Sequence, residues 1–201
     1  ATRAWDKEEK FSPEQYEAAR KIPSLDERFN EVRKFREGKG QVARTLVNVP
    51  YKFRYTHTAK SFLLILPRTT SERRKYLPIG FLGADSIVTD AVQVIYDPEL
   101  YAMGVLSSGM HMVWIKTVAG RLKTDFRYSN SLCYNTFPIP RLTVKQKEEI
   151  TRYVYALQEE REKHSEKTLG GLYDPDKMPT GLREIHHSLD LAVERCYRSK
   201  P

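Results

Sequence analysis

The sequence predicts an α+β fold in which a mixed, strand-rich domain lies between an N-terminal helical segment and a C-terminal helical pair. Three observations predict it. Helix-capping motifs precede apolar residues at helical spacing near both ends, and short apolar runs between prolines fill the middle. The length of 201 residues, 40% of them hydrophobic, is enough for a folded core. We expect the parts to be residues 1–40, 41–141 and 142–201.

The N-terminal part reads as helical. Residues 12–15, Ser-Pro-Glu-Gln, form a capping box with proline at the first helical position. Residues 24–27, Ser-Leu-Asp-Glu, form a second one, and Gly38 and Gly40 end the helix that follows. The spacing predicts that one face of this helix carries Leu25, Arg28, Phe29, Val32 and Phe35.

The middle part contains the expected strands. Aromatic and polar residues alternate over residues 51–56, which predicts a half-exposed strand. Residues 61–66 and 91–96 are more apolar and predict buried strands, and residues 132–134 predict a short last strand. Prolines separate these segments, as expected where strands end.

Helices are expected in the middle part and dominate the tail. Residues 101–118 read as one helix, and the proline-rich residues 137–140 as an extended linker. Residues 143–146, Thr-Val-Lys-Gln, form a capping box before the first helix of the tail. Residues 170–176 form the connection to the second helix. Its apolar stripe comprises Leu182, Ile185, Leu189, Val193 and Cys196.

The net charge of +8 is concentrated in the middle of the chain. Residues 41–82 carry eight basic and one acidic side chain, and residues 113–141 carry five and one. Residues 83–112 carry four acidic side chains and no basic one, and both ends are close to neutral. A focused basic region is typical of a polyanion-binding site. The alternative is that folding scatters these charges over several faces.

Several protein classes are excluded. No run of 18 apolar residues could span a membrane, and the charged residues 1–10 do not resemble a signal peptide. Cys133 and Cys196 are too few for a disulfide framework or a four-ligand zinc site. We therefore expect a cytoplasmic protein with no membrane partner.

Signals for catalysis are weak. No glycine-rich loop offers a nucleotide cradle. His186 and His187 are adjacent, so we expect one packed and one solvated histidine, and His111 reads as a core residue. Asp97 and Asp174 lie in acidic turns that hint at a nuclease but lack the second acid-x-lysine pair. We expect no enzymatic activity and no cofactor in this chain alone.

Ordered motifs give the chain a family resemblance. It is similar to the target recognition domain and C-terminal helical region of MmeI-like DNA methyltransferases, which include the type IIL restriction–modification enzymes. The likeness begins near residue 20 and extends to the end. The segments that carry it are residues 44–47, 50–53, 67–82, 104–114, 120–129, 134–140 and 172–193.

The resemblance implies a function and a larger parent protein. It implies a module that recognises a specific sequence in double-stranded DNA by reading bases in the major groove. In the family, a methyltransferase domain that precedes this module binds S-adenosylmethionine and modifies adenine at N6, and some members carry a nuclease. This sequence contains no cofactor-binding glycine motif. The resemblance therefore implies that the parent's methyltransferase domain is a partner of this chain.

Lys123 and Asp125 are the candidate base-reading residues. They are two apart, so in an extended segment they would project to the same side. Lysine donates to guanine O6 and N7, while aspartate accepts from the N4 amine of cytosine, so together they could read one G·C pair. The alternative is a local surface ion pair, worth under about 1 kcal/mol.

The other candidate DNA-binding residues come from residues 68–76 and 121–130, which offer cations and hydroxyls for phosphates. They are Arg68, Ser71, Arg73, Arg74, Lys75, Tyr76, Arg121, Arg127, Tyr128, Ser129 and Asn130. Two other functions stay open. The helical ends could form a protein-interaction module without specific DNA binding, or the chain could be a free-standing metal-dependent nuclease that uses Asp97 or Asp174.

Overall fold

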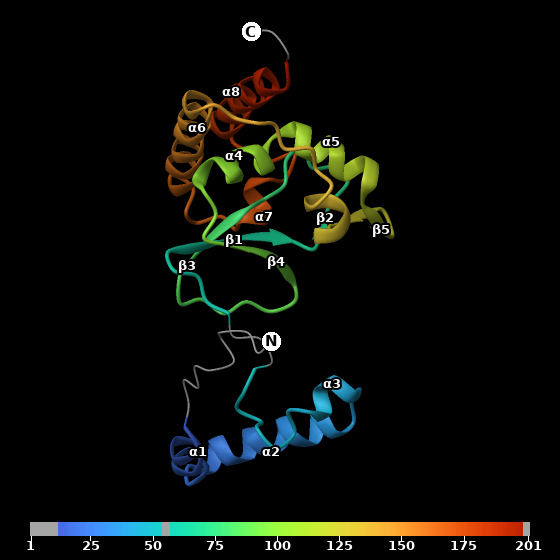
Figure 1. Ribbon diagram of the computed structural model, residues 1–201, viewed down its shortest axis with the longest axis vertical. Coiled ribbons are helices and arrows are strands. Elements are labelled where there is room, and N and C mark those ends of the chain that lie inside the picture. Colours follow the sequence, from blue (N-terminus) through green and yellow to red (C-terminus); the bar gives the residue numbers. More distant parts are fainter. Residues whose placement is uncertain (1–11, 54–56, 199–201) are drawn as a thin grey trace. The chain divides into compact units, whose positions relative to one another are not determined.

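A computed structural model describes residues 12–53 and 57–198 of the chain. The chain divides into two compact units, Ala1–His57 and Thr58–Pro201 (Figure 1). Helices and small antiparallel sheets alternate along it, which confirms the predicted α+β class.

The first unit is helical and has little core. It contains α1 (Pro13–Arg20), α2 (Pro23–Glu37) and α3 (Gln41–Arg44). The capping box at Ser12 forms as predicted. The one predicted at Ser24 does not, because α2 starts two residues earlier than expected, at Pro23, and its N-cap residue is Ile22. Tyr16 is buried, with its ring centroid 4.5 Å from that of Tyr51.

The predicted strand over residues 51–56 is not seen at residues 51–53, and residues 54–56 lie outside the described range. Arg36 supplies the reason. Its guanidinium donates to the carbonyl oxygens of Leu46, Val49 and Lys52 at 2.8, 3.0 and 2.8 Å. These bonds hold the chain against α2 in turns rather than in a strand. The predicted face of α2 is also weakly covered, since Phe35 is 64% exposed.

The second unit contains two three-stranded antiparallel sheets. The larger comprises β1 (Phe62–Pro67), β3 (Gly80–Gly83) and β4 (Val92–Tyr96) in the order β3-β1-β4. The smaller comprises β2 (Thr69–Thr70), β5 (Gly120–Leu122) and β6 (Asp125–Arg127) in the order β2-β6-β5. The strands predicted at residues 61–66 and 91–96 are thus confirmed as β1 and β4.

Two predictions for the middle of the chain are wrong. The expected helix over residues 101–118 is two helices, α4 (Leu100–Ser107) and α5 (Gly109–Val118). Ser108 between them is extended, and its hydroxyl accepts from the amide of His111 and so caps α5. The expected strand at residues 132–134 is the π-helix η2 (Asn130–Tyr134), which Ser129 caps through the amide of Leu132.

The C-terminal helices share one core with the larger sheet. They are α6 (Val144–Glu162), α7 (Leu169–Leu172) and α8 (Thr180–Tyr197), and the capping box at Thr143 forms as predicted. In Figure 1, α4 and α5 lie between the sheet and the pair α6 and α8. Buried side chains from all these layers form a continuous apolar cluster, which includes Leu64, Met103, Ile150 and Leu189.

Gly104 marks the closest approach in this core. A Cβ atom there would lie 2.3 Å from Cγ2 of Ile150, so α4 packs on α6 only because the residue has no side chain. We expect Gly104→Ala to lower the free energy of unfolding by about 1–3 kcal/mol through overpacking. Urea unfolding measures it. The control is Gly120→Ala, whose Cβ would meet no atom within 4 Å. Equal stability of the two variants would contradict the packing argument.

Candidate nucleic-acid interface

The small sheet β2-β6-β5 has one buried and one open face. Directly paired residues of antiparallel strands share a face. Phe126 pairs with Thr70 and Arg121, and Phe126 and Thr70 are buried. The other face carries the residues that pair with one another on either side of Phe126. None of their side chains is buried. They are Thr69, Leu122, Asp125 and Arg127.

Lys123 occupies the turn between β5 and β6 rather than an extended segment. Its φ of 57° is in the left-handed region, and its side chain is exposed. Asp125 is the first residue of β6 and pairs with Leu122. The premise that a two-residue spacing in an extended segment aligns Lys123 with Asp125 is therefore wrong. Within the described range neither side chain has an ion-pair partner, so the alternative of a local ion pair is not realised either.

Arg121 stabilises this hairpin from its inner side. Its Nη1 donates to Oε2 of Glu72 at 3.0 Å and to the carbonyl of Thr124 at 2.9 Å. Its guanidinium carbon lies 4.6 Å from the centroid of the Phe126 ring. Arg121 is therefore a structural cation that is still half exposed, with 52% of its side chain accessible. Arg127 on the open face is exposed.

The other predicted cations lie on loops around the sheet. Arg68 donates to the carbonyl of Asp90 at 2.7 Å. Arg73 forms an exposed ion pair with Asp176 at 2.7 Å, and Arg74 donates to the carbonyl of Gly170 at 3.1 Å. Lys75 is exposed. The hydroxyl of Ser71 accepts from the amide of Arg73 at 3.4 Å and shapes this loop.

Two predicted DNA-binding residues belong to the core instead. Tyr76 is 2% and Tyr128 1% exposed, so neither hydroxyl can reach a phosphate. Tyr76 donates to Oδ2 of Asp190 at 2.9 Å, and the Tyr128 hydroxyl lies 3.4 Å from Nε2 of His111. Burial raises the pKa of both tyrosines. The burial of these two tyrosines could not be predicted from sequence, because a tyrosine beside cations fits a core and a surface equally well.

Ser129 and Asn130 also serve the fold. The Ser129 hydroxyl is taken up by the cap of η2, and the Asn130 carbonyl accepts from the amide of Asn135 at 2.8 Å. The Asn130 side chain remains exposed. Of the predicted set, Arg121, Lys123, Asp125 and Arg127 lie on the β5–β6 hairpin.

A buried polar network connects α8 to these elements and was not predicted. Asp190 accepts from Tyr76 and, through Oδ1, from the amide of Gly109 at 2.7 Å. His186, stacked on Tyr76 with centroids 4.0 Å apart, lies 2.7 Å from the Tyr173 hydroxyl. Its neighbour His187 is exposed, as predicted. The available signal was the polar pair His186 and Asp190 on the side of an otherwise apolar stripe.

The remaining candidates have local structural roles. Asp97, at a φ of 49°, accepts from the amides of Lys60 and Ser61, which lowers its pKa. Asp174 accepts from the amide of Asp176 at 2.9 Å. The described residues contain no group of three or more His, Cys, Asp or Glu side chains placed to hold a metal ion. None of the helices in this part of the chain is long and apolar enough to cross a membrane.

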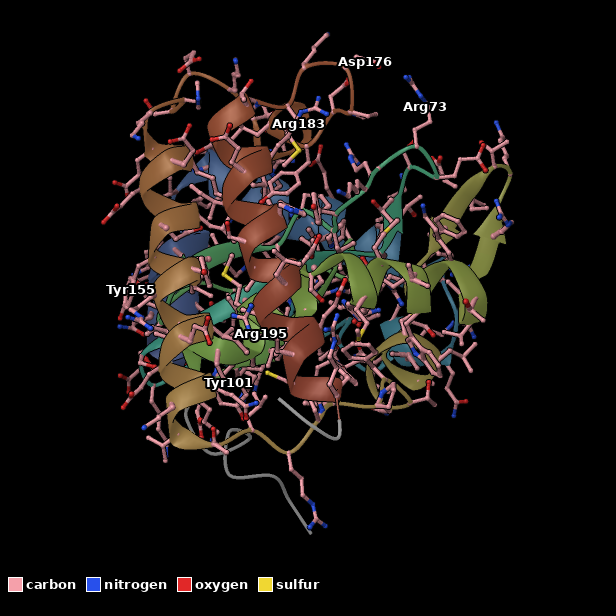
Figure 2. The ribbon with its side chains drawn as sticks, turned by 90° about the horizontal axis from the view of Figure 1, so that it is seen from above. Arg73, Tyr101, Tyr155, Asp176, Arg183 and Arg195 are labelled. Carbon is pink, nitrogen blue, oxygen red and sulfur yellow. The ribbon has the colours of Figure 1, made fainter. Side chains whose placement is uncertain are left out.

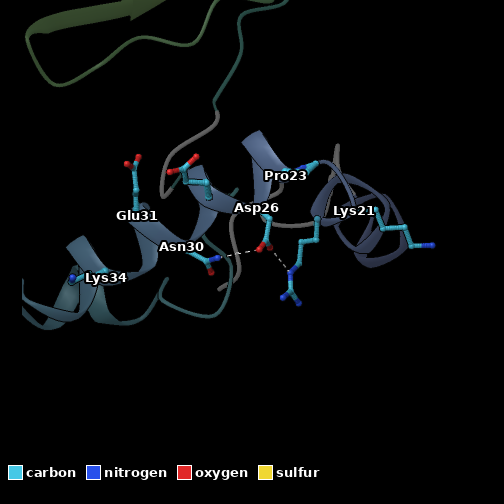
Figure 3. A pocket seen from close by; sticks show the side chains of 8 residues that line it. Lys21, Pro23, Asp26, Asn30, Glu31 and Lys34 are labelled. Carbon is cyan, nitrogen blue, oxygen red and sulfur yellow. Dashed lines mark hydrogen bonds and ion pairs between the residues drawn. The ribbon is translucent and has the colours of Figure 1, made fainter.

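The pockets of the N-terminal unit differ from the β5–β6 hairpin in their charge. One lies along α1 and α2, where Asp26 accepts from Arg20 at 2.9 Å and from Asn30 at 3.1 Å (Figure 3). Its charges are of both signs, and Arg20 and Asp26 form an ion pair within the lining. A second is lined mainly by apolar side chains, which include the exposed Phe35, Val42 and Phe53. Neither pocket gathers positive charge as the hairpin does.

The described residues thus form an α+β fold with a cationic hairpin on a small open sheet. Residues 11–141 match the family model described as the MmeI target recognition domain, and residues 142–201 match the MmeI C-terminal domain. The chain belongs to this family, which confirms the resemblance drawn from its motifs.

Two individual proteins that are similar to the chain support this family membership. The chain is 44% identical over 186 residues to DNA methyltransferase A of Bacillus subtilis strain 168, a match that covers 92% of this chain and 21% of that protein. It is also similar to the type IIL restriction–modification enzyme MmeI solved in complex with DNA, with a TM-score of 0.84 and 36% identity. That match covers 90% of this chain and 24% of the solved one. The chain thus spans about a quarter or less of these relatives.

Proposed function

We propose that this chain is the double-stranded DNA recognition module of an S-adenosylmethionine-dependent adenine-N6 methyltransferase or restriction–modification protein. Family membership and the likeness to a chain solved with DNA support this. Catalysis and cofactor binding are assigned to the parent's methyltransferase domain, and no step is assigned to residues of this chain. The module's task is to dock on a target sequence so that one adenine can be flipped into that domain.

One observation carries the proposal: the β5–β6 hairpin presents uncommitted donors and acceptors together. Lys123 at its turn and Asp125 and Arg127 on its open face have no ion-pair partner within the described range. A two-stranded β-ribbon fits the major groove, where lysine and arginine read guanine and aspartate reads cytosine. Arg68, Arg73, Arg74 and Lys75 on the flanking loops, with Arg121 of β5, would then contact phosphates, which fix register rather than sequence.

The proposal predicts a base preference that depends on Lys123 and Asp125. Binding of the full chain to a randomised duplex library, followed by sequencing, should enrich a motif. Alanine at both positions should erase discrimination at the guanine and cytosine that these residues read, worth about 1–3 kcal/mol or roughly 5- to 150-fold at each. Other positions of the motif should keep their preference. An unchanged preference at every position would remove these two residues from base reading.

A protein-interaction module is the second candidate, since the apolar pocket around Phe35 and Phe53 is exposed. The same library separates the two functions. Binding that is weak and without sequence preference, as expected of any protein with a charge of +8, would favour the interaction module.

A further inference from the structure

A small pocket lies where the recognition loop after β2 meets the start of α8. Its volume is about 90 Å³. That is well below the 300 Å³ or more typical of sites for drug-sized ligands. The pocket therefore suits a compact group rather than a base or nucleoside. It is lined by Lys75, Tyr76, Tyr173, Pro175, Met178 and Arg183.

Two cations line this pocket, and no carboxylate neutralises them. Arg183 donates to the carbonyl oxygens of Pro175 at 2.6 Å and Met178 at 3.2 Å, which hold its guanidinium in place without cancelling its charge. Lys75 lies with Nζ 5.2 Å from the centroid of the Tyr76 ring. Within the described range, neither cation has an ion-pair partner.

The acidic and hydroxyl groups nearby are committed elsewhere. Asp176 pairs with Arg73, and Asp190 accepts from Tyr76 and from the amide of Gly109. The hydroxyl of Tyr173 is bonded to Arg161 and to His186. The pocket thus combines two positive charges, that of Arg183 held in place by hydrogen bonds, with an aromatic floor, a setting that attracts an anion.

One loop connects the pocket to the candidate DNA interface. The loop of residues 71–76 begins where β2 ends, and Glu72 in it is bonded to Arg121 of the hairpin. The next residue, Arg73, reaches across to Asp176. Figure 2 shows this pair facing each other across the two loops, with Arg183 beside them and Arg195 farther along the same helix.

We propose that Lys75 and Arg183 bind a phosphate group of the duplex backbone, so that the C-terminal helical region anchors DNA directly. This rests on the proposed function. Free phosphate would satisfy the same chemistry, and the experiment distinguishes the two sources. Backbone contacts carry no sequence information, so this anchor adds affinity without changing base preference.

The test compares two arginines of one helix. Arg183→Gln and Arg195→Gln each remove one charge from α8, but Arg195 is bonded to Glu149 at 2.5 Å at the other end. Duplex binding by the full chain is measured over a series of salt concentrations. Arg183→Gln should reduce the slope of log K against log salt by about 0.9, the value for one phosphate contact, and leave the enriched motif unchanged. Arg195→Gln should leave the slope within error of the wild type.

Arg183 also donates hydrogen bonds to backbone carbonyls, so Arg183→Gln changes the loop as well as the charge. A second variant separates these two effects. Lys75→Gln breaks no hydrogen bond recorded in the described part of the chain and should reduce the slope by the same amount. Unchanged slopes in both variants would overturn the proposal. So would stabilisation by inorganic phosphate that is lost in both variants while their slopes stay normal, which would make free phosphate the ligand. If the wild type binds no duplex at all, the proposed function itself fails.

Discussion

Acidification from pH 7 to pH 5 is expected to lower the free energy of unfolding by about 4 kcal/mol through two buried histidines. His111 and His186 are both fully buried. Burial lowers the pKa of His111 to about 4 and that of His186 to about 3. The charge of Arg161 beside Tyr173, and that of Lys75, lower the pKa of His186 further.

Stability falls on acidification because the folded and the unfolded chain bind different numbers of protons. Unfolded histidine titrates near pH 6.5, so below that pH the unfolded chain binds protons that the folded chain does not. Stability is therefore constant above about pH 6.5 and falls as the pH drops toward the folded-state values. Each histidine contributes about 1.4 kcal/mol per pH unit, or about 2 kcal/mol at pH 5.

Burial holds both rings neutral, and the hydrogen bonds fix which ring nitrogen carries the proton. Nδ1 of His111 donates to the carbonyl of Leu106 at 2.7 Å, which leaves Nε2 as the acceptor facing Tyr128. Tyr173 accepts from Arg161, so its own proton points to Nε2 of His186. A protonated ring in either place could no longer accept the hydrogen bond from the tyrosine hydroxyl. Its positive charge would also be buried and uncompensated.

Urea unfolding at several pH values between 5 and 7 measures this dependence. His186→Gln should reduce the loss between pH 7 and pH 5 to about 2 kcal/mol, whatever its effect on stability at pH 7. His187→Gln, at the exposed neighbouring position, is the control and should leave the loss unchanged. If the two variants behave alike, His186 does not titrate as argued.

What could be predicted from sequence was what local chemistry decides. Ser12 and Thr143 begin helices because each side chain and the glutamine three residues later satisfy one another's amides. The apolar runs of β1 and β4 form strands because they are short and lie between turn residues. These signals lie within a few residues, so no knowledge of the fold was needed.

What could not be predicted depends on contacts distant in sequence. Tyr76 is buried because two residues more than a hundred positions later cover it: His186 stacks on its ring, and Asp190 accepts a hydrogen bond from its hydroxyl. Arg183 became a candidate only when folding brought it beside Lys75. Lys123 and Asp125 were chosen on a premise that the turn at Lys123 overturns, yet the hairpin still presents both.

Asp190→Ala is expected to lower the free energy of unfolding by about 3 kcal/mol. One carboxylate holds two separate elements: Oδ2 accepts from Tyr76 at 2.9 Å, and Oδ1 accepts from the first amide of α5 at 2.7 Å. Alanine would leave both donors without a partner, and each costs about 1–3 kcal/mol when buried. The charge at the N-terminus of α5 would also be lost.

We expect Asp190→Ala to change DNA binding as well as stability. Tyr76 ends the loop that carries Arg73 and Lys75, and α5 ends two residues before β5 begins. Loosening both elements should reduce discrimination between target and non-target duplex, even at temperatures where the variant is folded. A merely less stable chain would bind both duplexes less in equal proportion.

Thermal unfolding and duplex binding together test this role. The melting temperature of Asp190→Ala should fall by roughly 6–12 °C, since about 1 kcal/mol corresponds to about 2–4 °C in a domain of this size. Asp176→Ala is the control, because its ion pair with Arg73 is exposed to solvent and contributes little to stability. Gly104→Ala, which is destabilised without touching Asp190, supplies the second control for binding. If Asp190→Ala discriminates between duplexes as well as Gly104→Ala does, Asp190 stabilises the fold but does not position the hairpin.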